Sequence, residues 1–167
     1  MAIITLNNNS LSNISSLPAG VGGKVLQVVQ GSTTTATTLT SQTWTDTTLS
    51  ASITPSSTSN KIIILVNQMF NIYRPGVGDA GGSIRLLRDS TVVYGGDIAY
   101  QLYSEAGSAS NINFYDYTSL SYLDSPSSTS SLTYKTQQRS YDAEDRTTTQ
   151  SGSSKSTITL MEIAGWL

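Results

Sequence analysis

The sequence predicts an all-β fold, an antiparallel β-sandwich of about eight to ten strands with an extended N-terminal arm. Apolar residues recur with a period of two, and helical spacing of apolar residues is absent throughout. Clusters of Gly, Pro, Ser, Asn and Asp separate the alternating segments at short intervals. Many short strands with such turns are typical of a sandwich, and we expect a jelly-roll-like one.

The expected strands differ in their hydrophobic pattern. Alternation is clear at residues 48–53 and 132–135, as in strands with one buried face. The segment Lys61–Tyr73 begins with the run IIILV, apolar on both faces, and then alternates, as expected of a long central strand. In chain order the expected strands are 24–30, 41–45, 48–53, 61–73, 83–88, 91–94, 97–102, 112–123, 132–135 and 157–163.

The 167 residues fit one domain with a core of its own, which we place at residues 24–167. Residues 1–23 differ in composition and are expected to form an anchoring arm that ends in a Gly-rich hinge. Its apolar residues are too sparse to bury one another, so they need a partner surface or the domain body; a frayed tail is the alternative. They are Ile3, Ile4, Leu6, Leu11, Ile14 and Leu17.

The composition excludes much catalytic chemistry. The chain has no histidine and no cysteine, while Ser and Thr make up about three residues in ten. Without histidine there is no Ser-His-Asp triad, imidazole base or His-ligated zinc, and without cysteine no thiolate nucleophile or disulfide. We therefore expect a protein that is not an enzyme, has no cofactor, and holds a shape or presents a surface.

The charge and the hydropathy pattern narrow the range of possible partners further. The formal net charge is −2 and 12% of the residues are charged, so no basic field exists for binding nucleic acid. No segment approaches the roughly 18 consecutive apolar residues of a membrane span. The N-terminus also lacks the pattern of a secretory signal, so we expect synthesis in the cytoplasm and later function within an assembly.

The densest acidic cluster comprises Asp142, Glu144 and Asp145. Its oxygens are of the type that binds Ca²⁺, but the spacing does not match an EF-hand loop, and a solvated loop is the favoured interpretation. Whether this loop binds a metal stays open at this point. A polysaccharide depolymerase acting through these carboxylates is the least favoured function.

Aromatic residues gather in the middle of the chain, where tyrosine offers a rigid face and a polar end suited to binding surfaces or sugar rings. Most of them are expected to fill the sandwich or a subunit interface. Residues in or beside irregular segments are instead the candidates for a surface-binding tip. These candidates are Tyr73, Arg74, Tyr100, Tyr103 and Tyr141.

Three stretches together resemble small virion structural proteins of tailed bacteriophages, notably marine phages of cyanobacteria. They are residues 19–30 (AGVGGKVLQVVQ), 47–66 (TTLSASITPSSTSNKIIILV) and 157–167 (TITLMEIAGWL). The resemblance implies a protein of the tail-fibre, head-fibre or capsid-decoration type, located on the virion surface. It carries over no catalytic residues.

Such proteins dock on the particle through an N-terminal arm while the body projects outward, usually as a trimer. Here the resemblance implies other virion proteins as partners of the arm, a homotrimer, and a glycan or protein of the host surface as the outer partner. Without a long heptad segment the chain cannot form a coiled-coil shaft, so we expect a compact knob. A lectin-like carbohydrate-binding module that is not permanently attached to a particle is the alternative.

The strand expected at Lys61–Tyr73 leaves one structural question open. Its apolar start on both faces would suit a strand between the core and a neighbouring subunit, and would equally suit a fully internal strand.

Overall fold

The structure is a computed structural model that describes residues 25–95, 101–105 and 111–165. The expected arm at residues 1–23, with its six apolar residues, lies outside the described residues, as does Tyr100. No helix among the described residues has the length and apolar character needed to cross a membrane.

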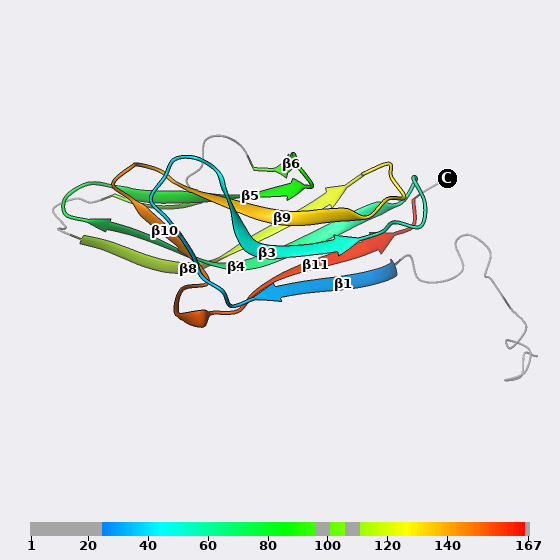
Figure 1. Ribbon diagram of the computed structural model, residues 1–167, viewed down its shortest axis with the longest axis horizontal. Coiled ribbons are helices and arrows are strands. Elements are labelled where there is room, and N and C mark those ends of the chain that lie inside the picture. Colours follow the sequence, from blue (N-terminus) through cyan, green and yellow to red (C-terminus); the bar gives the residue numbers. More distant parts are fainter. Residues whose placement is uncertain (1–24, 96–100, 106–110, 166–167) are drawn as a thin grey trace, which may run out of the picture.

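Eleven strands and one short 3₁₀ turn, η1, make up the described fold (Figure 1). Their bounds are β1 Val25–Thr33, β2 Thr37–Leu39, β3 Thr45–Ile53, β4 Lys61–Pro75, β5 Ala80–Arg88, β6 Thr91–Tyr94, β7 Leu102–Ser104, β8 Asn111–Asp124, β9 Leu132–Ser140, β10 Arg146–Thr149, η1 Ser151–Ser153 and β11 Ser156–Ile163. The all-β prediction is confirmed.

Two antiparallel sheets pack face to face. In sheet A, β4 lies in the centre and pairs with β8 along almost its whole length. The other edge of β4 pairs with β11 along its first half and with β10 along its second half. Beyond these, β1 pairs with β11, and β2 pairs with β10. In sheet B the order is β3-β9-β5, and β6 and β7 share the remaining edge of β5.

The strand order is that of a jelly roll. If β1 and β2, β6 and β7, and β10 and β11 each count as one interrupted strand, the chain has eight strand positions. Sheet A then holds them in the order first, eighth, third, sixth, and sheet B in the order second, seventh, fourth, fifth. This arrangement confirms the predicted jelly-roll-like sandwich.

The core lies between the sheets because alternate residues of each strand point inward. Burial alternates strictly along β9 and β11, and the largest buried side chains include Tyr134 and Phe70. Glycines permit close approach at two points: a Cβ on Gly31 would lie 2.1 Å from the Ser50 carbonyl oxygen, and one on Gly82 would lie 2.4 Å from a Thr147 methyl group.

Several predicted strand bounds were wrong. Residues 41–44 form a bend, in which the Ser41 carbonyl accepts a hydrogen bond from the Ser140 amide, rather than a strand. The strands β2 and β10 were missed because they are three and four residues long and rich in threonine. Strand β9 runs on to Ser140, beyond the expected end at residue 135. Its inward residues at this end are Thr136, Gln138 and Ser140, which are polar and therefore give no apolar alternation in the sequence.

The structure also decides the question about β4. Ile62, Ile64 and Val66 are buried in the core, whereas Leu65 on the opposite face is 41% exposed. Within one chain, the outer face of β4 is therefore open around Leu65 and Asn67, whereas Met69 and Asn71 further along the same face are buried.

Candidate surface-binding tip

The candidate site lies at the end of the sandwich where β4 runs into β5. The loop 76–79, the loop 141–145 and β7 meet there, because β7 and β10 pair with the strand ends on either side of the β4–β5 connection. The start of β1 lies at the opposite end, since Val25 pairs with Ile163, which in turn pairs with Lys61 at the start of β4. Figure 1 shows these two ends at the left and the right of the sandwich.

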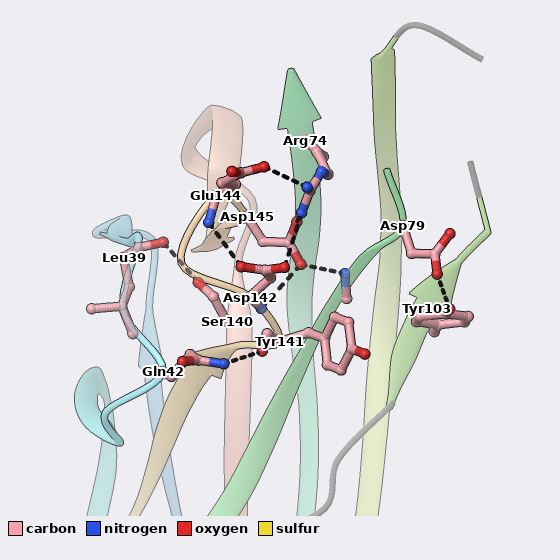
Figure 2. A network of polar contacts seen from close by, with 11 residues as sticks. Leu39, Gln42, Arg74, Asp79, Tyr103, Ser140, Tyr141, Asp142, Glu144 and Asp145 are labelled. Carbon is pink, nitrogen blue, oxygen red and sulfur yellow. Dashed lines mark hydrogen bonds and ion pairs between the residues drawn. The ribbon is translucent and has the colours of Figure 1, made fainter. Parts of the chain in front are cut away.

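Arg74 lies at the centre of a polar network that is buried at Arg74 and Asp145 and open to solvent at Asp142 and Glu144 (Figure 2). Its guanidinium pairs with Asp145, with Nη1 3.2 Å from Oδ1, and with Asp142, with Nη1 3.4 Å from Oδ2. Nη2 also donates to the carboxylate of Glu144. Arg74 is only 8% exposed and Asp145 is fully buried. One cation therefore holds the whole acidic loop against the end of β4.

Backbone amides complete the surroundings of these carboxylates. Asp145 Oδ2 accepts hydrogen bonds from the amides of Gly81 at 3.0 Å and Asp142 at 3.3 Å. Burial nevertheless raises the pKa of the Asp145 carboxyl, whereas the hydrogen bond from the Glu144 amide lowers the pKa of Asp142. Within the described part of the chain, no group of three or more acidic side chains could hold a metal ion. At the acidic loop, the Arg74 guanidinium lies where a cation would.

A pair of tyrosines lies on the outer face of sheet B. Tyr103 and Tyr141 are 39% and 38% exposed, and their rings meet edge to face with centroids 5.9 Å apart. The Tyr103 hydroxyl donates to Asp79 Oδ2 at 2.6 Å, and this hydrogen bond raises the pKa of Tyr103 to about 12. Gly81 lies beneath both rings: a Cβ there would be 3.0 Å from Tyr141 Cβ and 3.2 Å from Tyr103 Cδ2. We call Tyr103 and Tyr141 the tyrosine pair.

The structure divides the predicted tip residues among three environments. Tyr103 and Tyr141 form the exposed pair on sheet B. Tyr73 lies on the outer face of sheet A, where the Arg146 guanidinium stacks 4.3 Å from its ring centroid. Arg74 points between the sheets and is buried, so it organises the tip rather than presenting its charge to a ligand.

Two residues of the site escaped sequence analysis. Asp79 lies in the segment RPGVGD between two expected strands, which indicates a turn, and only its hydrogen bond with Tyr103 reveals that it orients the ring. Gly81 sits inside a strand, and its lack of a side chain matters only because two rings from other strands lie over it. The sequence carries no clear signal for this, because the strand expected at 83–88 does not include Gly81, and only the pairing of β5 with β7 places Gly81 beneath the rings.

No protein-family model matches this chain, and no curated protein matches it significantly.

Proposed function

We propose that this chain is a structural protein of a tailed-bacteriophage virion, a fibre, receptor-binding or capsid-decoration protein whose N-terminal arm docks a trimeric knob on the particle. The observation that carries the proposal is the placement of the two ends. The chain enters the sandwich at Val25, at the end opposite the tyrosine pair. A body docked through the residues before Val25 would hold this pair away from the particle.

The fold and the surface chemistry support the same proposal. Jelly rolls recur in viral capsid proteins and in lectins, although a fold alone does not specify a function. The tyrosine pair supplies rigid, half-exposed rings with a polar group at the rim, which suits a glycan or a protein of the host surface. Resemblance of the sequence to small virion proteins points the same way.

Deletion of residues 1–23 tests the arm. We expect the truncated chain to fold and to keep its oligomeric state, but to be absent from purified particles when it replaces the full chain. Cryo-electron microscopy of intact particles would locate the full-length protein. A truncated chain that is incorporated as well as the full chain would contradict docking through the arm.

The matched variant for the other end is Tyr103→Ala combined with Tyr141→Ala. Because both rings are half-exposed, we expect this variant to fold and to enter particles normally, while adsorption of the particles to host cells falls. Normal adsorption would exclude the tyrosine pair as the outer contact and leave docking through the arm unaffected.

A free carbohydrate-binding module is the second candidate, and the tyrosine pair is the observation that favours it. Such a module would bind glycans as an isolated protein. A glycan array with the purified chain distinguishes the two functions: strong binding that is lost in the double tyrosine variant, without any association with particles, would support the module.

A further inference from the structure

The outer face of sheet A carries almost no charge. Its strand residues fall into rows that cross β1, β11, β4 and β8. Among the described strand residues on this face, only Lys61 and Arg146 are charged, and they lie toward opposite ends of β4. One row is wholly apolar and the next two consist mainly of hydroxyl and amide side chains. The apolar row is Val28, Met161, Ile63 and Leu123, and the rows after it are Gln30, Thr159, Leu65 and Ser121, then Ser32, Thr157, Asn67 and Ser119.

Large apolar side chains on this face are open to solvent in the single chain. Val28 is 58% exposed, Leu123 is 47% exposed and Leu65 is 41% exposed. Shallow hollows lie between them, one lined by Leu65, Ser121 and Thr159 and another by Ile63, Leu123 and Ile163. A contiguous exposed apolar patch of this kind marks an interaction surface in soluble proteins.

The outer face of sheet B has the opposite character. Lys135 pairs with Asp46 at 2.6 Å across β9 and β3. The guanidinium groups of Arg85 and Arg139 lie 4.4 Å and 5.1 Å from the Trp44 ring centroid. The charges of the two outer faces are thus concentrated on sheet B, as expected if sheet B meets solvent and sheet A meets protein.

The size of the sheet A face suits a stable interface. With strands about 4.8 Å apart and about 3.3 Å per residue, four strand positions along the 15 residues of β4 cover roughly 900 Å². This is an upper value for the free surface, because Met69 and Asn71 on this face are already buried within the chain. A standard protein interface takes about 800 Å² from each partner.

We infer that the outer face of sheet A packs against other copies of this chain and forms the subunit interface of the oligomer. An uncharged face of hydroxyl and apolar groups is compatible with itself, because contact between copies buries no unpaired charge and brings no like charges together. A strongly charged partner would instead find no complementary charge there. The inference rests on the proposed function in placing these copies as a trimer on a particle, with sheet A turned inward.

An axis parallel to β4 fits both ends of the chain. Copies packed through sheet A around such an axis would present every start of β1 toward the same side and every tyrosine pair toward the other. Docking of several arms at once would then strengthen attachment to the particle.

Analytical ultracentrifugation of the purified full chain tests the interface, with the variants Leu65→Lys and Val28→Glu made separately. We expect the wild type to sediment as a trimer and each variant to dissociate, with a dissociation constant raised roughly 100-fold because a charge is buried unpaired. Val92→Lys is the matched control, since Val92 is 40% exposed on β6 of sheet B, and it should leave the trimer intact.

Folding of the variants is checked by circular dichroism, and the use of two sites on different strands separates loss of the interface from loss of the fold. A monomeric wild type would mean that another segment or partner covers this face and would overturn the inference. Trimers retained by both folded variants would overturn it as well. Because these measurements use isolated protein, their outcome is independent of whether the chain is found on particles, which tests the proposed function.

Discussion

Arg74 shows how one residue organises the tip of the molecule. Its guanidinium compensates the buried carboxylate of Asp145 and ties the loop 141–145 to the end of β4. A buried carboxylate without its cation is strongly destabilising, whereas the same group protonated is tolerated. The tip therefore depends on this pair more than on its surface side chains.

Replacement of Arg74 by methionine should lower the free energy of unfolding by about 3 kcal/mol at neutral pH, because Asp145 is left as a buried unpaired charge. Burial already raises the pKa of Asp145, and loss of the guanidinium raises it further. A group whose pKa is raised on folding favours the folded state when protonated, so the deficit should shrink as the pH falls. Urea unfolding of the wild type and the variant, at acid and at neutral pH, measures this difference in the free energy of unfolding. The exposed control Lys155→Met should change stability by less than about 0.5 kcal/mol.

Tyr103 provides a second test at the residue scale. Its hydrogen bond to Asp79 raises the pKa of Tyr103 to about 12, so the stability from this bond is complete below the ordinary value of 10.0 and is lost as the pH rises toward 12. In Asp79→Ala we expect Tyr103 to ionise near its ordinary value. The difference in ultraviolet absorbance between chains with and without Tyr103→Phe isolates this group. Ionisation at the same pH with and without Asp79 would show that the aspartate does not hold the ring.

At the scale of elements, Glu162 links three parts of the chain. It is 1% exposed on β11 and accepts hydrogen bonds from Gln27 on β1 at 2.5 Å, and from the Ser56 amide and Asn60 Nδ2 of the β3–β4 connection at 2.7 Å and 2.5 Å. Burial opposes its charge, but these hydrogen bonds outweigh burial and lower the pKa of Glu162. The carboxylate thus fastens the end of the sandwich where the chain enters.

The variant Glu162→Gln should cost about 2 kcal/mol at neutral pH, because an amide nitrogen then faces donors and the charge-assisted hydrogen bonds are lost. A pKa lowered on folding gives stability that is present above the unfolded value of about 4.5 and is lost as the pH falls through the folded value. The difference in the free energy of unfolding between wild type and variant should therefore disappear only in strong acid. An equal gap at neutral and strongly acid pH, measured by urea unfolding, would argue against an ionised Glu162.

The elements also show why strand prediction from sequence was incomplete. Long strands with an apolar inner face, such as β4 and β11, were recognised because their alternation is hydrophobic. Strands β2 and β10 contain mainly threonine on both faces, and they are strands because β4 and its neighbours offer a ladder to pair with. Pairing of this kind is a property of the assembled sheet.

At the scale of the whole molecule, the two sheets share one core and should unfold together. Ile64 lies near the start of β4 and is fully buried in the core that the two sheets share. Truncation in Ile64→Ala should lower the free energy of unfolding by about 3 kcal/mol through lost burial and the cavity left behind. Circular dichroism and aromatic fluorescence should report the same single transition, as expected for one domain. Separate transitions would mean that the sheets fold independently. Val92→Ala on the exposed face of β6 is the control and should have little effect.

The sequence by itself determined the fold class and excluded imidazole and thiol chemistry. A period of two in the hydrophobic pattern reports that strands have two unlike faces, and absent residue types need no structure to be recognised. Of the residues predicted for a surface-binding tip, Tyr103 and Tyr141 lie together on one surface, and their role in binding stays a prediction.

Only the tertiary structure decided how the faces are used. It turned Arg74 inward, separated Tyr73 from the tyrosine pair, and left the outer face of β4 open around Leu65. The physical reason is that each of these outcomes depends on partners distant in the chain, namely the loop 141–145 for Arg74, β10 for Tyr73 and the position of sheet B for β4. Local patterns in a sequence indicate that a side chain of a strand can face either the core or the outside of the sandwich. Pairing between distant segments selects one of these two environments.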